Sequence, residues 1–246
     1  MGFRVFVLCL QQLRNNWQTA LRISWFWWLL LTAGGFAMRS FAQRPDDANA
    51  GSVALIVLVT ALVALIGGTI IAIAWHRFVL REDTFGNMLI FQNGWPVGTY
   101  IWALIRLALI LFVLLVPLVF VFALNPGLMA SGPSLLISVA MGIVFTWVFL
   151  RVGLVFPAIA VGKTLKIRES FQMTRPFATE LLITSGLLVA IQTFPGILQL
   201  LAVAAGAESL SVILIPINLL FSWVNLFLGI GVLTVMYGHL CENRPI

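Results

Sequence analysis

The chain has 246 residues, of which 61% are hydrophobic and 9% are charged, with a net charge of +6 and a mean hydropathy of +1.08. A soluble domain of this length carries roughly 25% charged residues, so the composition excludes a soluble protein and predicts that lipid surrounds much of the chain. The basic residues form no groove with interleaved aromatic residues, so no nucleic-acid partner is expected. We expect one integral membrane domain over residues 1–246.

The N-terminal segment is amphipathic. Apolar residues from Phe3 to Leu10 recur at helical spacing, which is typical of a helix lying flat in the headgroup layer. The first long apolar run follows, and it includes the aromatic stretch 25–28, a face suited to partner helices or lipid. Because about 22 residues precede this run, we expect an uncleaved first span rather than a signal peptide.

Six apolar runs are long enough to cross a bilayer, since a spanning helix needs about 20 apolar residues. We therefore predict an all-α fold, a six-span transmembrane helical bundle with both termini inside. The predicted spans are Ala20–Phe41, Val53–Trp75, Val97–Leu124, Leu135–Phe156, Leu181–Ala205 and Leu210–Gly238.

The distribution of basic residues sets the predicted orientation. Of the 14 Lys and Arg residues, all except Arg39 and Arg44 lie in segments that we assign to the cytoplasmic side. This is the positive-inside pattern. It predicts a multi-pass protein of the bacterial inner (cytoplasmic) membrane whose inner cations face anionic lipid.

The segments that lead into the first, third and fifth spans align when the chain is shifted by 80 residues. Short segments with helical apolar spacing occur at 3–10, 85–89 and 167–171, and a polar break follows each. The alignment predicts three tandem repeats, each an interfacial helix followed by a transmembrane hairpin, over 1–80, 81–160 and 161–246. The alternative is that the same physics recurs at three places without common ancestry. The matched residues of the repeat motif are Gln12, Gln92 and Gln172, and Thr19, Thr99 and Thr179.

The second, fourth and sixth spans end in an aromatic residue followed by a cation: 75–77, Trp147 with Arg151, and Tyr237 with His239. This pattern is typical of the interfacial belt at a cytoplasmic membrane boundary. We interpret both histidines as belt residues rather than metal ligands, because no helical His pair or paired Cys spacing accompanies them.

The polar residues do not predict catalysis. Every acidic residue lies in a loop or in the first turn of a span, whereas ion-coupled transporters and proton relays place a carboxylate at mid-bilayer. The chain has no nucleophile elbow, phosphate-binding Gly loop or dinucleotide fingerprint. We expect no enzyme activity, cofactor or metal, and we expect Cys9 and Cys241 to be reduced thiols.

Arg106 is the most unusual charge, because it lies about ten residues into the third span, roughly 15 Å along the helix. A charge at that depth costs on the order of 3 kcal/mol unless it snorkels or pairs. In one interpretation it snorkels toward the cytoplasmic surface, helped by a partner such as Glu180 or Glu82, and in the other it contacts an anion or lipid headgroup in an inward-facing cavity. The candidate lipid or anion contacts are Arg106, Lys163, Lys166, Arg168 and Arg175.

Asn218, Ser222 and Asn225 share one face of the last span, at i, i+4 and i+7. Such a face either forms hydrogen bonds between helices, worth about 0.6 kcal/mol each, or lines a polar pathway. Small residues that would let helices approach closely are Gly67, Gly68, Gly229 and Gly231.

The stretch 149–177, FLRVGLVFPAIAVGKTLKIRESFQMTRPF, resembles the YciC-like family of bacterial six-helix membrane proteins. The family pattern is an Arg after a helix, then Pro-Ala, then a Ser-containing helix that ends near Thr-Arg. The matching positions are Arg151, Pro157-Ala158, Ser170 and Thr174-Arg175, whereas Pro176 stands where the family usually has Gly. The resemblance implies a multi-pass inner-membrane protein and assigns no activity.

These observations favour a non-catalytic role as an accessory, scaffold or assembly component of a membrane complex. The expected partners are membrane lipids, anionic on the cytoplasmic side, and a membrane protein or a second copy of the chain. The alternative function is an uncoupled transporter or channel for a lipid or small amphipathic solute, with Arg106 and the Asn218–Asn225 face lining the passage.

Overall fold

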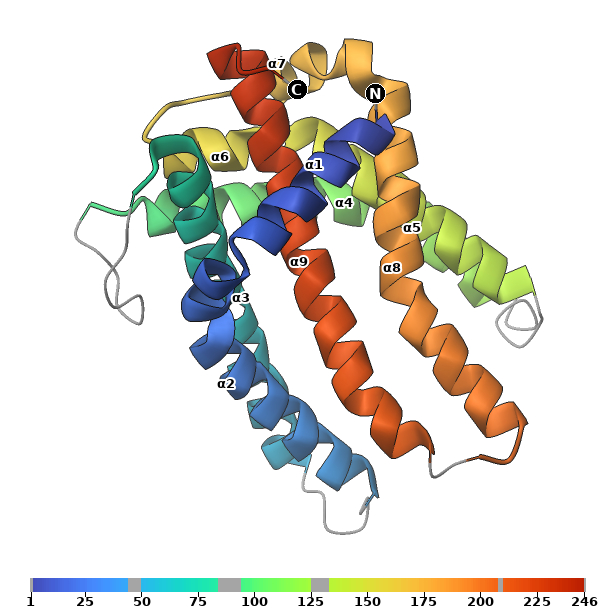
Figure 1. Ribbon diagram of the computed structural model, residues 1–246. Helices are drawn as coiled ribbons and strands as arrows, with labels where there is room; N and C mark the ends of the chain where they lie inside the picture. Colours follow the sequence, from blue (N-terminus) through green and yellow to red (C-terminus); the bar gives the residue numbers. More distant parts are fainter. Residues whose placement is uncertain (1, 44–49, 84–93, 125–132, 208–209, 246) are drawn as a thin grey trace.

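The computed structural model describes residues 2–43, 50–83, 94–124, 133–207 and 210–245, and all regular structure in these ranges is helical. The prediction of an all-α fold is confirmed. The long helices come in three successive pairs, α2–α3, α4–α5 and α8–α9; α1 precedes the first pair, and the short helices α6 and α7 lie between the second and third (Figure 1). The helices are α1 Gly2–Asn15, α2 Trp17–Gln43, α3 Ala50–Arg81, α4 Val97–Leu124, α5 Pro133–Val152, α6 Val155–Ala160, α7 Ile167–Met173, α8 Ala178–Ala204 and α9 Leu210–Glu242, with a 3-10 turn, η3, at Arg175–Phe177.

The core lies at the end of the molecule where both termini are found, and we call this end the hub (Figure 1). There the C-terminal halves of α3 and α9 pack against each other and against α1 and α6. Trp75 on α3 is fully buried, and its ring lies 5.0 Å from that of Phe227 on α9. Burial of large aromatic side chains contributes much of the stability of such a core.

Helix α1 crosses α8 and α9 and closes the hub (Figure 1). Its amphipathic pattern was expected to place the apolar face in the headgroup layer. Instead, Val5, Phe6 and Cys9 are buried against the protein, whereas Phe3 and Leu10 are exposed. The buried stripe is therefore rotated from the expected one, because two neighbouring helices, rather than lipid, cover this side of α1.

The prediction that the residues at the end of α3 lie in the interfacial belt is wrong. Trp75 and His76 are both fully buried inside the hub. Trp147 on α5 donates its indole N–H to the backbone oxygen of Ala178 at 2.8 Å, so it connects α5 to the start of α8. Only His239 of the belt histidines remains partly exposed.

Away from the hub, the helix pairs separate and expose apolar side chains. Leu58 on α3, Phe112 on α4, Leu200 on α8 and Leu220 on α9 are each more than half exposed. Soluble proteins rarely expose contiguous apolar surface on this scale. A lipid environment removes that penalty, because lipid chains are as apolar as the side chains themselves.

Three helices in the described part of the chain are long and apolar enough to cross a membrane: Gly51–Arg81, Arg175–Ala204 and Ile213–Glu242. They correspond to the second, fifth and sixth predicted spans. Shorter apolar helices, Val97–Val113 and Leu136–Val152, lie in the third and fourth. The first predicted span falls in the 27-residue α2, where Arg22, Arg39 and several Trp residues dilute the apolar character. The six-span count and the inside location of both termini stay predictions.

Helix boundaries keep a spacing close to that of the predicted repeats. Helices α2, α4 and α8 begin at Trp17, Val97 and Ala178, and α3 and α9 begin at Ala50 and Leu210. Helix α5 departs from the scheme, because it ends at Val152 and the short α6 follows it. The segment 85–89 and Gln92 lie outside the described residues. Three-repeat ancestry stays a prediction.

Candidate functional site

The residues that carry the family resemblance converge at the hub. Arg151, at the end of α5, is 5% exposed, and its guanidinium lies 3.7 Å from the ring centroid of Phe171 on α7. Its Nη2 donates to the backbone oxygen of Phe171 at 3.0 Å. The backbone oxygen of Arg151 in turn accepts from Ser170 Oγ at 2.9 Å and from Thr174 Oγ1 at 3.1 Å. These contacts fix α7 against the end of α5, which is a structural role.

Several other cations at the hub also satisfy backbone carbonyls. Arg81 donates to the backbone oxygen of Val161 at the end of α6, and Arg244 donates to that of Leu80 at 2.6 Å. The last carbonyls of a helix lack partners within it, so a nearby cation stabilises them by hydrogen bonding and by the helix dipole. Because Arg151 is buried, the expectation that all inner cations face lipid is wrong for that residue, whereas Arg81 and Arg244 are exposed and their contact with lipid stays a prediction.

A polar network is buried between α3, α4 and α9. The Nδ1 atom of His76 lies 2.8 Å from Thr234 Oγ1, and the Tyr100 hydroxyl lies 3.4 Å from His76 Nε2. Because the Thr234 hydroxyl donates its only hydrogen to the Ile230 carbonyl at 2.7 Å, it must accept from His76 Nδ1–H. Because His76 is fully buried, its charged form is disfavoured, and the neutral ring accepts from the Tyr100 hydroxyl through Nε2. Its role is to join three helices.

A separate cavity of about 360 Å³ lies between α4, the α5–α6 turn and the segment 164–167, and we call it the α4–α6 pocket. Its interior is apolar and includes Leu107, Val155 and Phe156, whereas the polar side chains Thr99, Arg106, Thr164 and Lys166 also line it. The complete lining is Thr99, Ala103, Arg106, Leu107, Val152, Val155, Phe156, Ile159, Thr164, Leu165, Lys166 and Ile167.

The local sequence explains why the chain returns to α4 at this point. Gly162 follows α6 with a φ of 76°, a left-handed conformation that favours glycine and commonly ends a helix. The chain then runs without regular structure to Lys166, which caps α7. The Glu169 carboxylate accepts the Lys166 backbone N–H at 2.9 Å, so the backbone that carries the Lys166 side chain is held in place.

Arg106 lacks a compensating carboxylate in the part of the chain that the structure describes. Its guanidinium lies 5.4 Å from the Trp102 ring centroid on the same helix, which is a cation–π contact. The described ion pairs involve Arg77, Lys163 and Arg244, so neither Glu180 nor Glu82 pairs with Arg106. Arg106 and Lys166 are both exposed. The pocket therefore presents two uncompensated cations beside an apolar interior.

The other predicted lipid contacts do not line this pocket. Lys163 Nζ lies 3.9 Å from Glu242 Oε1. Arg168 and Arg175 are exposed on α7 and η3. The structure thus brings together Arg106 and Lys166 from the predicted set. It also adds Thr99 from the repeat motif, and Thr164, which the sequence interpretation missed. The turn signal at Gly162 is the one feature that could have pointed to Thr164.

The repeat motif does not form one site. Gln12 lines a shallow cavity with residues of α3 and α9. Thr19 is half-buried, Gln172 and Thr179 are exposed, and Thr99 lies in the α4–α6 pocket.

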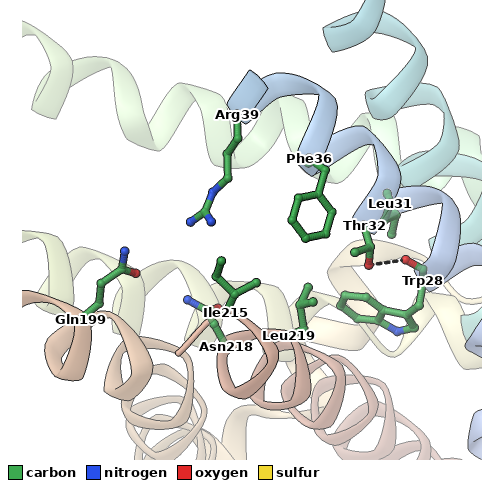
Figure 2. Close-up of a pocket in the computed structure, with 10 residues that line it drawn as sticks. Trp28, Leu31, Thr32, Phe36, Arg39, Gln199, Ile215, Asn218 and Leu219 are labelled. Carbon is green, nitrogen blue, oxygen red and sulfur yellow. Dashed lines mark hydrogen bonds between the residues drawn. The ribbon is translucent and has the colours of Figure 1, made fainter. Parts of the chain in front are cut away.

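The predicted polar face of α9 is divided between two neighbours. Ser222 Oγ donates to Asn218 Oδ1 at 3.4 Å within the helix. Asn225 Nδ2 donates to Gln192 Oε1 at 3.0 Å and so joins α9 to α8. Asn218 instead faces a groove toward α2 (Figure 2). The three side chains therefore do not line a single passage.

In the described ranges, no group of three or more His, Cys, Asp or Glu residues could hold a metal ion.

Comparison with protein-family models, with curated proteins and with solved structures found no match to this chain. The resemblance to the YciC-like family stays a prediction.

Proposed function

We propose that this chain is a non-catalytic, multi-pass protein of the bacterial inner membrane that binds an anionic lipid in the α4–α6 pocket and acts as an accessory or scaffold component of a membrane complex. The observation that carries the proposal is the presence of Arg106 and Lys166 beside one apolar cavity. An amphipathic anion satisfies both parts of this arrangement.

The dimensions of the pocket agree with a small amphipathic ligand. A volume of about 360 Å³ lies within the usual range for small-molecule sites, about 300–1,000 Å³. Basic pockets between transmembrane helices on the cytoplasmic side are typical binding places for anionic headgroups. Arg offers a planar, two-pronged donor set for phosphate, and Lys adds a compact charge.

The arrangement supports a binding site better than a passage. A passage lined by Arg106 and Asn218 would have to connect the α4–α6 pocket with the groove between α2 and α9. Helix α3 packs against α2, α4, α6 and α9, so a core helix lies between the two regions. Uncoupled transport of a lipid or solute remains the alternative proposal, with less support.

The test is native mass spectrometry of the protein released from nanodiscs that contain phosphatidylglycerol. Each basic residue near a membrane surface contributes about 1 kcal/mol to the binding of anionic lipid, which is roughly fivefold in affinity. We expect Arg106→Gln and Lys166→Gln each to reduce bound phosphatidylglycerol by about that factor. Arg168→Gln is the matched control, because Arg168 is exposed nearby but does not line the pocket.

Equal lipid occupancy in all three variants, with unchanged thermal stability, would contradict the binding proposal. A stoichiometric partner protein that co-purifies in mild detergent would support the scaffold role. Lipid flux into liposomes that depends on Arg106 would favour transport instead.

A further inference from the structure

A second groove lies between α2 and the α8–α9 pair, away from the hub, and we call it the α2–α9 groove (Figure 2). Its volume is about 280 Å³. Trp28, Leu31, Phe36, Ile215 and Leu219 supply an apolar wall. Its polar side chains are Thr32, Arg39, Gln199 and Asn218.

Arg39 and Gln199 lie near the helix ends remote from the hub, whereas Asn218 lies deeper, about 12 Å from the start of α9. At 1.5 Å per residue, Arg39 lies about 6 Å from the end of α2 at Gln43, and Gln199 lies about 8 Å from the end of α8. A headgroup layer is about 5–8 Å thick. Trp28 lies about 22 Å from the same end of α2, at the depth of lipid hydrocarbon. The groove therefore runs from headgroup depth into the apolar layer.

The Arg39 side chain extends from α2 into the groove, and Asn218 and Gln199 lie across from it on α9 and α8 (Figure 2). Thr32 is already satisfied, because its hydroxyl donates to the Trp28 carbonyl at 2.7 Å. Arg39 has no ion pair in the described ranges. The groove thus offers a guanidinium and two side-chain amides as donors above an apolar slot.

The groove opens sideways to the surroundings of the helices. Leu29, Phe36 and Leu220 beside it are each more than half exposed. A molecule in the bilayer could therefore reach the slot laterally, without crossing a polar surface.

We propose that the α2–α9 groove binds one phospholipid of the outer leaflet, with its phosphodiester at Arg39, Asn218 and Gln199 and an acyl chain along Trp28, Phe36 and Leu219. The charge pattern selects this occupant, because a phospholipid supplies an anion to Arg39, which forms no ion pair with the described residues, and a hydrocarbon chain that the slot accommodates. A partner helix would have to supply its own carboxylate at that depth. The inference rests on the membrane orientation proposed above but is independent of the α4–α6 pocket.

Two variants test the two halves of the groove. Arg39→Gln removes the charge, and we expect apparent affinity for a phospholipid to fall about fivefold. Gly35→Leu fills the slot, since a Cβ at Gly35 meets no atom within 4 Å and the wider packing is left intact. Arg22→Gln is the matched control, an exposed Arg on the hub end of the same helix.

The readout is the number of phospholipids bound per chain by native mass spectrometry, with dioleoyl phosphatidylglycerol or phosphatidylcholine as the probe and dioleoylglycerol as the phosphate-free control. We expect Arg39→Gln to lower the affinity for one phospholipid about fivefold, Gly35→Leu to abolish its binding, Arg22→Gln to change neither, and dioleoylglycerol not to compete. Unchanged phospholipid binding in both groove variants would overturn the inference. So would an Arg39-dependent dimer, which would identify a second copy as the occupant.

The two lipid sites can be told apart in one experiment. If both proposals hold, combining Arg39→Gln with Arg106→Gln lowers the occupancy of two lipids, one for each substitution, each about fivefold. Loss with Arg39→Gln alone would support the outer groove and reject the inner pocket, and loss with Arg106→Gln alone would do the reverse.

Discussion

The indole N–H of Trp223 on α9 donates to the hydroxyl of Ser24 on α2 at 2.8 Å, between residues 199 positions apart in the chain. Ser24 is fully buried, and its own hydroxyl hydrogen goes to the Ala20 carbonyl at 2.7 Å. These two hydrogen bonds connect α2 to α9 below the hub. This contact lies at the hub end of the α2–α9 groove, because Trp223 is one helical turn from Leu219, which lines the groove.

Ser24→Ala should destabilise the protein by about 0.6–1.7 kcal/mol, since it leaves the partly buried Trp223 indole donor without its acceptor. Thermal unfolding in detergent measures the effect. Ser40→Ala is the control, because Ser40 also donates to a carbonyl four residues back, at 3.0 Å, but is exposed. If Ser24→Ala and Trp223→Phe were additive in a double-mutant cycle, the bond would contribute no coupling energy.

Thr234→Val should cost about 1–3 kcal/mol, because the substitution removes the acceptor for the buried His76 Nδ1–H. Thr234→Ser keeps the hydroxyl and should restore most of the stability. Thr193→Val serves as the control, since Thr193 donates only to backbone oxygens of its own helix. Equal losses from the Val substitutions at both positions would show that the His76 contact contributes nothing.

The close approach of α2 and α3 depends on a specific glycine. A Cβ at Gly67 would lie 2.7 Å from the Trp27 ring, whereas one at Gly68 would meet nothing within 4 Å. We expect Gly67→Ala to cost about 1–3 kcal/mol through overpacking. Gly68→Ala should be neutral or slightly stabilising, because Ala favours the helix by about 1 kcal/mol. Matching melting temperatures for the two variants would rule out this close contact.

The contrast between these two glycines shows what the sequence could and could not predict. Both were expected to let helices approach, and only Gly67 does, because a run of small residues does not specify which face meets a neighbour. Hydropathy likewise predicted the long helices but placed His76 at a membrane boundary. Its burial depends on Thr234, 158 residues away, and local patterns carry no information about such a pairing.

The candidate site could be predicted only in part, again because local patterns do not show which distant segments meet in the fold. The depth of Arg106 in an apolar run marked it as unusual. Its neighbour in space, Lys166, comes from a segment that returns to α4 only because α6 is short and Gly162 turns the chain. Counting cations also overestimated the lipid contacts by Arg151, which is buried and donates to a backbone carbonyl in the folded chain.

Cys9 should be inert toward maleimides in the folded protein. It is 2% exposed, and burial raises the pKa of its thiol to about 12, so the reactive thiolate is scarce at neutral pH. In a Cys241→Ala background we expect labelling only after denaturation, whereas in a Cys9→Ala background the partly exposed Cys241 should react. The pKa of this thiol is higher in the folded protein than in the unfolded chain. The thiol therefore stabilises the fold fully at pH values below its ordinary pKa, and this stabilisation is lost as the pH rises toward 12. Rapid native labelling of Cys9 would show that α1 does not pack this side chain against α9.

The proposed orientation predicts which ends of the helices face the outside of the cell. In a variant without Cys9 and Cys241, Ser52→Cys near the start of α3 should react with a membrane-impermeant maleimide applied to intact spheroplasts. Arg168→Cys, on α7 at the hub, should react only after the membrane is opened. Both side chains are exposed, so a difference between them reports sidedness rather than burial. Labelling of Arg168→Cys in intact spheroplasts would reverse the orientation and move Arg39 to the inner leaflet. The α2–α9 groove would then face the cytoplasmic leaflet, and the α4–α6 pocket with Arg106 would face the outer leaflet.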